Sequence, residues 1–180
     1  KKGEDWYAFT QFQAIAARRS FVSFDEPSYK ATFALSLTVR SNHSALANAP
    51  QVSEEHLGSG TKRVRFATTK KIPTYLVALA VGPLDVVQGE PIAANSVRRV
   101  PVRLRGVSPR GQGGRLAYAL QHTGSLLQIL EEYVGLPYPF QKLDIVAVPE
   151  LAGGAMENAG LITFREWILL VDESTAPVNQ

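Results

Sequence analysis

The sequence contains no cysteine, which excludes disulfide bonds, thiolate zinc sites and a cysteine nucleophile from this chain and leaves its cellular compartment unknown. It has no apolar run near the ~20 residues of a membrane-spanning helix, so we expect no membrane segment in it. The sequence also has no long cluster of charges of one sign. The net charge is only +3, and the 19 lysines and arginines are scattered. No nucleic-acid partner is therefore indicated.

Histidine is scarce as well. The chain has only His43, His56 and His122, and no two of them are spaced four residues apart. The HExxH motif of zinc peptidases, which places two histidine ligands on one face of a helix, is absent. His122 lies among the apolar positions of a predicted helix, where a surface or packing role is expected. We therefore predict no metal site in this chain.

The chain has enough apolar residues for a core. It is 180 residues long and 45% hydrophobic, which suffices for one good-sized core or two modest ones. Residues 30–40 and 63–68 alternate between apolar and polar side chains, as half-buried strands do. Residues 75–81 are apolar on both faces, which favours a more deeply buried strand. The first part is therefore predicted to be β-rich.

A break follows at Gly82-Pro83. Residues 1–84 carry more basic than acidic groups, whereas residues 85–180 carry more acidic groups. Together, the turn signal and the change in charge predict a domain boundary, with domains 1–84 and 85–180.

The second part contains the clearest helix signal. Residues 115–134 carry an apolar face about 30 Å long, and Gly135 and Pro137 mark its end. Around this helix we expect an edge strand at 100–105, which contains Pro101, and strands at 143–150, 161–166 and 167–171. The fold class is predicted to be α+β and predominantly β, with one long helix packed on a sheet. The helix face comprises Leu116, Leu120, Thr123, Leu127, Leu130 and Val134.

A glycine-rich stretch, GGAMENAGLITF at 153–164, contains a single charged residue, Glu157. Its carboxylate at Glu157 has no cation within a few residues, and Gly153 and Gly154 expose the backbone beside it. An exposed loop carboxylate is the simplest interpretation. A site for a cationic, peptide-like ligand would need the same parts, because a carboxylate and an ammonium about 4 Å apart attract by roughly 4 kcal/mol at a dielectric near 20.

GAMEN at 154–158 resembles the exopeptidase motif of the zinc metallo-aminopeptidases typified by aminopeptidase N. Further matches occur in the order of that family: TQFQ at 10–13, AARRSFVSFDEPSYKATF at 16–33, YLVALAVG at 75–82 and GLPYPFQKLDIVAVPE at 135–150. The resemblance covers most of the chain and is weakest at 42–60 and 89–112.

The resemblance implies a role for each residue of the site. Glu157 would bind the free α-amino group of a peptide and so restrict hydrolysis to its N-terminal residue. The backbone of Gly154 and Ala155 would align the substrate, and Met156 would line the first side-chain pocket. Gln13 stands where many relatives have Glu, which leaves more of the amine binding to Glu157. The implied substrate-binding residues are Gln11, Gln13, Gly154, Ala155, Met156 and Asn158.

The resemblance also implies an architecture and a cofactor. Residues 1–84 would be the later part of an N-terminal antiparallel β-domain, and residues 85–180 the start of a thermolysin-like catalytic domain. The family uses a zinc held by HExxH and a distant Glu, on a helix that begins soon after GAMEN. We therefore expect zinc in the parent enzyme and none bound by this fragment, which we expect to be inactive by itself.

Other residues are interpreted as structural. The acids of Asp25-Glu26-Pro27 are expected in a turn, with Arg18 and Arg19 as structural partners of such carboxylates. Val22-Ser23 replaces a Pro-Cys pair that is frequent in relatives. Two alternatives stay open: a non-catalytic peptide- or protein-interaction module that retains the scaffold, and a bifunctional epoxide hydrolase and aminopeptidase.

Overall fold

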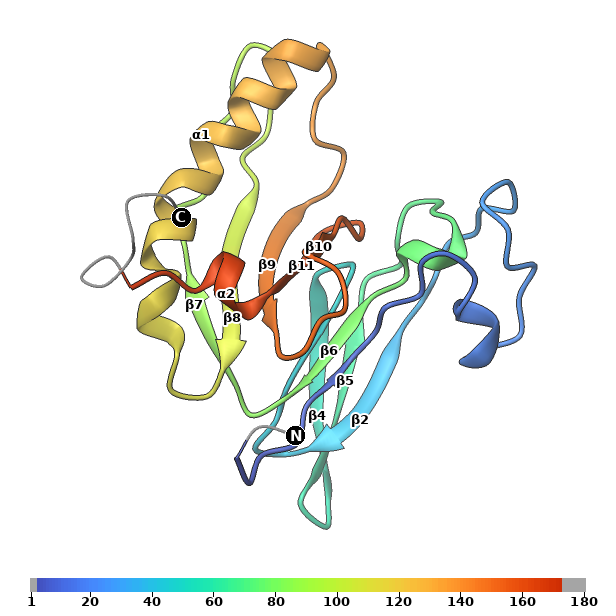
Figure 1. Cartoon of the computed structure of the whole chain (residues 1–180). Coiled ribbons are helices and arrows are strands. Elements are labelled where there is room, and N and C mark those ends of the chain that lie inside the picture. Colours follow the sequence, from blue (N-terminus) through green and yellow to red (C-terminus); the bar gives the residue numbers. More distant parts are fainter. Residues whose placement is uncertain (1–2, 173–180) are drawn as a thin grey trace. The chain divides into compact units, whose positions relative to one another are not determined.

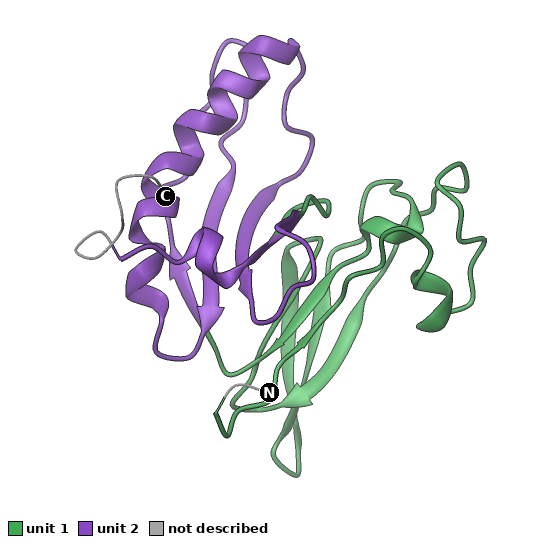
Figure 2. Cartoon of the chain, viewed as in Figure 1, with its two compact units in different colours: residues 1–84, 156–162 green, residues 85–155, 163–180 purple. Residues whose placement is uncertain are grey.

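The computed structural model describes residues 3–172 (Figure 1). The chain forms two compact units (Figure 2). Unit 1 comprises Lys1–Leu84 together with Met156–Ile162, and unit 2 comprises Asp85–Ala155 and Thr163–Gln180. The short segment that contains Glu157 therefore groups with unit 1, although the chain reaches it from unit 2.

Unit 1 contains two three-stranded sheets. In the first, β6 (Leu79–Gly82) lies between β1 (Ala8–Phe9) and β3 (Ser44–Ala47) and is antiparallel to both. In the second, β5 (Thr61–Phe66) lies between β2 (Ser36–Arg40) and β4 (Gln51–Gly58), again antiparallel to both. A core cluster of Ala47, Val64 and Phe66 is extended by Leu35, Leu37, Val39 and Ala45.

The strands of unit 1 differ in detail from those predicted. β2 begins at Ser36, whereas Ala31 forms only an isolated bridge with Ile72. The apolar run at 75–81 divides into a short 3-10 helix, η2 (Thr74–Leu76), and β6. Another 3-10 helix, η1, spans Ala17–Arg19. β3 and β4 were not predicted, because β4 is exposed along its whole length and carries no regular apolar pattern.

The second unit is built on a five-stranded sheet with the order β10-β11-β9-β8-β7. β8 and β9 are parallel, and every residue of β9 is buried, as in a strand covered on both faces. Part of β10 and the beginning of β11 belong to the segment Met156–Ile162. The strands are β7 (Leu84–Gln88), β8 (Arg103–Pro109), β9 (Lys142–Val148), β10 (Ala155–Met156) and β11 (Leu161–Arg165).

One long helix packs on this sheet, as predicted. A 3-10 turn, η3 (Gly113–Leu116), leads into α1 (Ala117–Val134). Gly135 ends the helix in the left-handed conformation, with φ of 71°, and its N–H donates to the Glu131 carbonyl at 2.8 Å. This is the conformation that glycine adopts without strain. Leu116 is fully buried, and it lies so close to Gly106 of β8 that a Cβ there would come within 3.2 Å of it.

The buried face of α1 differs from the predicted stripe near the C-terminal end of the helix. Leu130 and Val134 are each 58% exposed, whereas Glu131 is 3% exposed. The helix turns a charged residue inward because Glu131 has hydrogen-bond partners on other segments. Within residues 3–172, no helix is both long and apolar enough to cross a membrane.

Two predictions for unit 2 are wrong. The strand expected at an edge lies inside the sheet. β8 begins at Arg103, after Pro101, and its own proline, Pro109, is its last residue, so neither proline interrupts the ladder within the strand. The strand expected at 167–171 is instead α2 (Glu166–Leu169), a single helical turn in which the Leu170 N–H donates to the Glu166 carbonyl at 2.8 Å. Trp167 on this turn is 61% exposed, so the apolar residues there do not form a buried strand.

Candidate functional site

The loop that carries Glu157 follows β9 and is fixed at its base by Arg165. The Arg165 Nε donates to the Leu151 carbonyl at 2.7 Å, and Nη2 donates to the Ala152 carbonyl at 3.1 Å. The Arg165 N–H also donates to the Gly154 carbonyl at 2.8 Å. Arg165 of β11 therefore binds three backbone carbonyls of the loop, those of Leu151, Ala152 and Gly154. Sequence reasoning missed Arg165, because nothing in its own surroundings shows that it folds back on residues 151–154.

Around Glu157 the side chains alternate between exposed and buried. Ala155 and Glu157 are exposed, whereas Met156 is 0% exposed and Asn158 is 2% exposed. Alternation of this kind is what an extended backbone produces. The two buried neighbours anchor the chain on either side of Glu157, so its carboxylate points outward from a fixed backbone. Gly153 and Gly154, just before this segment, are exposed.

Beyond Glu157 the chain makes a tight turn into β11. The Leu161 N–H donates to the Asn158 carbonyl at 3.1 Å, and Gly160 has φ of 70°, which a residue with a side chain rarely adopts. The Asn158 side-chain nitrogen is buried without a hydrogen-bond partner among the described residues. Such a donor costs free energy unless a partner is supplied.

The Glu157 carboxylate has no counterion within residues 3–172. It forms no ion pair or hydrogen bond with any described residue. This contrasts with Asp25, Glu131 and Asp144, which are all buried and all paired with arginine. Glu157 is therefore a carboxylate that is both accessible and available to a cation.

Gln11 and Gln13 lie just after β1, in the same compact unit as Glu157. Both are exposed, and Phe12 between them is 8% exposed. The Phe12 ring packs edge-on against Phe21, with 6.0 Å between the ring centroids. The peptide bond after Gln13 is cis. Burial of Phe12 turns the two glutamine side chains toward solvent.

The predicted site residues are thus distributed over both units. Five of them belong to unit 1, and Gly154 and Ala155 belong to unit 2, directly before Met156 in the chain. The five in unit 1 are Gln11, Gln13, Met156, Glu157 and Asn158.

The Asp25 turn has the structural role that was predicted for it. The Arg18 Nε donates to the Asp25 carboxylate at 3.0 Å, and the Thr74 hydroxyl donates to it at 2.6 Å. The hydrogen bond from Thr74, followed by those from Arg18, lowers the pKa of Asp25 below its ordinary value of 3.8, against the opposing effect of burial. Arg18 and Asp25 are therefore framework residues.

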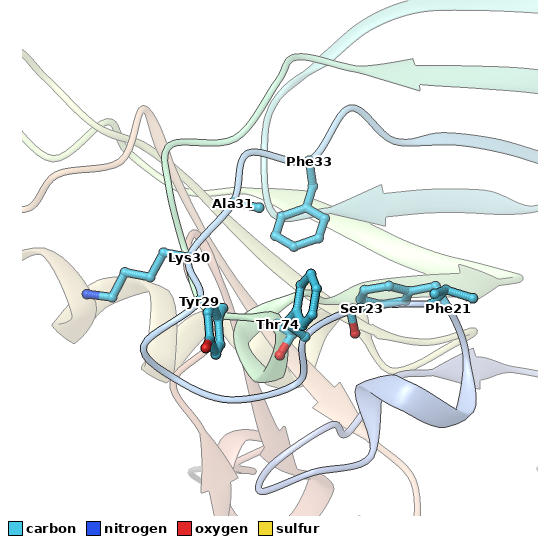
Figure 3. Close-up of a pocket in the computed structure, with 9 residues that line it drawn as sticks. Phe21, Ser23, Tyr29, Lys30, Ala31, Phe33 and Thr74 are labelled. Atoms are coloured by element: carbon cyan, nitrogen blue, oxygen red, sulfur yellow. The ribbon is translucent and has the colours of Figure 1, made fainter.

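A separate aromatic pocket of about 350 Å³ lies in unit 1 (Figure 3). Its walls include Phe21, Tyr29, Phe33 and Thr74. No predicted site residue lines it, so the pocket gives no support to the site at Glu157.

No metal centre forms from the described residues. Residues 3–172 contain no group of three or more His, Cys, Asp or Glu side chains that could hold a metal ion. His122 is exposed and packs against Tyr118, with 4.4 Å between the ring centroids. These residues therefore do not fit a zinc site.

Comparison with known proteins adds an independent result. The Peptidase M1 N-terminal domain matches residues 1–76, and the Peptidase family M1 domain matches residues 118–180. Aminopeptidase M1-C of Oryza sativa subsp. japonica is 42% identical over 172 residues, which are 96% of this chain and 19% of that protein.

Two other relatives are similar to the chain over nearly its whole length. Puromycin-sensitive aminopeptidase of Caenorhabditis elegans is 39% identical over 178 residues, which are 98% of this chain and 18% of that protein. Endoplasmic reticulum aminopeptidase 2 of Bos taurus is 41% identical over 172 residues, or 96% of this chain and 17% of that protein. The chain spans about a fifth of the length of the curated relatives it matches.

Proposed function

Because this chain belongs to peptidase family M1, we propose that it is part of an aminopeptidase in which Glu157 binds the free α-amino group of the substrate peptide. The observation that carries this proposal is the state of Glu157: an exposed carboxylate, without a counterion among the described residues, between two buried neighbours. A fixed backbone and an accessible charge are what an amine site requires.

The charge of Glu157 suits the proposed ligand. A peptide α-amino group has a pKa near 8 and is largely protonated at neutral pH. A carboxylate about 4 Å from this ammonium attracts it by roughly 4 kcal/mol at an effective dielectric near 20, before desolvation of both groups. An internal peptide bond has no such charge. Glu157 would thus select the N-terminus of a peptide and determine which bond is hydrolysed.

The backbone beside Glu157 suits an extended peptide. β10 is the outermost strand in the order of its sheet, and Gly153 and Gly154 before it are exposed. An extended peptide can add to such an edge through main-chain hydrogen bonds. In this arrangement the backbone of Gly154 and Ala155 aligns the substrate, while Arg165 keeps residues 151–154 in place.

The other proposed substrate contacts are uncharged. Gln11 and Gln13 are exposed and lie in the same unit as Glu157, where their amides can hydrogen-bond to the substrate near its N-terminus. The Met156 side chain is 0% exposed, so we propose that it supports the first side-chain pocket from beneath its surface. Asn158 has a buried nitrogen that lacks a partner among the described residues. Glu157 is the only anion of the set, so we assign the charge recognition to it.

The zinc that the resemblance implies would supply the activated water for hydrolysis. Because residues 3–172 offer no metal site, we assign to this chain only the binding and orientation of the peptide.

The test compares Glu157→Gln with the unmodified aminopeptidase that contains this chain. We expect KM for a free-amine substrate to rise and kcat to fall, with kcat/KM at least about tenfold lower, since that corresponds to roughly 1.4 kcal/mol of lost transition-state binding. Glu150→Gln is the matched control, because Glu150 is an exposed carboxylate of the same loop and should leave kinetics unchanged.

An N-acetylated peptide separates charge recognition from general damage. The unmodified enzyme should cleave it far more slowly than the free-amine peptide, and Glu157→Gln should reduce this difference. If Glu157→Gln and Glu150→Gln have the same kinetics, the amine role is refuted. If the protein binds peptides and hydrolyses none, the non-catalytic interaction module is the better description.

A further inference from the structure

We propose that Asn48 is a positioning residue. It holds the backbone of residues 156–162, which carries Glu157 and is called the Glu157 loop below, against the segment that leads into β6. This inference rests on the proposed function, because the position of the loop affects catalysis only if Glu157 binds the substrate amine. Asn48 directly follows β3, belongs to the same compact unit as Glu157, and is 4% exposed. Sequence reasoning did not single it out.

Both donor hydrogens of the Asn48 amide are used, and its oxygen accepts one hydrogen bond. Its Nδ2 donates to the Leu76 carbonyl and to the Ala159 carbonyl, each at 2.8 Å. Its Oδ1 accepts from the Ala78 N–H, also at 2.8 Å. An amide has two donor hydrogens and one acceptor oxygen, so this geometry leaves neither donor unpaired. Burial makes each bond costly to lose.

These bonds connect two segments that lie far apart in sequence. Leu76 and Ala78 lead into β6, whereas Ala159 lies two residues after Glu157 and 111 residues after Asn48. Ala159 is itself 4% exposed. Asn48 therefore fixes the distance between the start of β6 and the backbone that carries the proposed amine anchor.

The other flank of β6 holds the glutamine segment. β6 lies between β1 and β3, and Thr10 follows β1. The Thr10 N–H donates to the Leu79 carbonyl at 3.2 Å, and its hydroxyl accepts from the Leu79 N–H at 3.0 Å. Gln11 is the next residue. The four residues from Leu76 to Leu79 thus position Gln11 on one side and, through Asn48, the Glu157 loop on the other.

A displacement of the backbone at Ala159 should also displace Glu157, two residues earlier. Asn158, between them, is buried, and its carbonyl accepts from the Leu161 N–H. This part of the chain is therefore short and constrained at both ends. A displacement of about 1 Å at a substrate-binding group can reduce catalysis by about 100-fold, so the hydrogen bond from Asn48 to Ala159 is expected to affect amine binding.

The first test measures amide hydrogen exchange in the 180-residue chain. Asn48→Ala should accelerate exchange in residues 156–162 by about tenfold more than in the rest of unit 1, because it removes the bond to Ala159. Thr74→Val is the matched control. It removes another buried hydrogen bond of unit 1, the 2.6 Å bond to Asp25, which does not involve residues 156–162. Equal acceleration by both variants would overturn the inference.

A second variant covers the case in which Asn48→Ala does not fold. Asn48→Ser retains a hydroxyl, but it is too short to reach the Leu76 and Ala159 carbonyls together. We expect the same selective acceleration in residues 156–162. If neither variant folds, Asn48 is a framework residue of unit 1 and the inference is overturned.

The second test uses kinetics in the aminopeptidase that contains this chain. A purely structural role would reduce the fraction of active enzyme, which lowers kcat for all substrates equally and leaves KM unchanged. A positioning role should raise KM for the free-amine peptide by about tenfold and reduce the preference for it over the N-acetylated peptide. An unchanged KM and an unchanged preference would refute the role of Asn48.

The Glu157→Gln variant distinguishes the two proposals. If Glu157→Gln loses the free-amine preference and Asn48→Ala keeps it, only the inference about Asn48 fails. If Glu157→Gln itself keeps the preference, the proposed function fails, and with it the role of Asn48 in amine binding.

Discussion

The Arg98 guanidinium and the Glu131 carboxylate form a buried ion pair, with 2.7 Å between Nε and Oε1 and each side chain 2% exposed. Glu131 also accepts hydrogen bonds from the Asn95 side chain and from the Tyr138 N–H, both at 2.7 Å. Arg98 donates to the carbonyls of Ile92, Ala93 and Val100. This network attaches the segment before β8 to the C-terminal end of α1.

We expect Arg98→Met to destabilise the chain by about 3 kcal/mol or more, because it leaves the Glu131 charge buried without its partner. The free energy of unfolding in urea measures this loss. The double variant Arg98→Met/Glu131→Leu is the control, since it buries no charge. It should be more stable than Arg98→Met alone, and the reverse order would show that the pair does not account for the loss.

Lys142 is expected to give the chain an alkaline pH dependence. It is 2% exposed and donates to the Asp144 carboxylate at 2.7 Å. Burial lowers the pKa of Lys142 from 10.5 to about 8, although the charge of Asp144 raises it. Between these two values the unfolded chain binds more protons than the native one, so the stability contributed by this group rises with pH from about 8 to about 10.5.

Lys142→Met should remove this rise. Urea unfolding at pH 7.5, 9 and 10 measures it for both proteins, and Arg105, which also pairs with Asp144 at 2.7 Å, remains as a partner for the carboxylate. Lys70→Met, at an exposed lysine, is the control and should keep the rise. A Lys142→Met curve parallel to that of the unmodified chain would contradict the assignment.

Arg165→Met should loosen the loop before Glu157, because it removes the two side-chain hydrogen bonds to the carbonyls of Leu151 and Ala152. We expect faster amide exchange or proteolysis within residues 151–155 and little change in unit 1. Arg115→Met is the control, since Arg115 also donates to a backbone carbonyl, that of Leu170. Equal cleavage of the loop in both variants would exclude the specific role of Arg165.

Ser23→Ala should stabilise unit 1. The Ser23 hydroxyl is buried in the wall of the pocket in Figure 3 and has no hydrogen-bond partner among the described residues. A buried hydroxyl without a partner costs free energy, so its removal should raise the free energy of unfolding by about 1 kcal/mol. Ser28→Ala, at an exposed position, should have almost no effect. A lower melting temperature for Ser23→Ala would show that the hydroxyl is satisfied in solution.

Local sequence patterns identified the long helix and several of the strands. The helix predicted at 115–134 is α1 with its 3-10 turn, because the apolar spacing and Gly135 specify a helix and its end without reference to the rest of the chain. The strands at 63–68, 143–150 and 161–166 correspond to β5, β9 and β11. Errors occurred where an element depends on distant partners.

The residues of the candidate site also divide into those that local sequence identifies and those that depend on distant partners. The sequence singled out Glu157 from its glycine-rich surroundings, and its role in amine binding stays a prediction. Arg165 and Asn48 carry no local signal, because their side chains donate to carbonyls of residues 13 or more positions away.

The sequence by itself therefore determined the balance of strands and helix, the position of the long helix and the family of the chain, since these depend on periodicity and on motifs within short segments. Only the tertiary structure decided that Glu131 is buried and Leu130 exposed, that β8 lies inside its sheet, and that the Glu157 segment groups with unit 1. Burial of a charge or an amide is favourable only when partners from other segments satisfy it, and local sequence does not specify those partners.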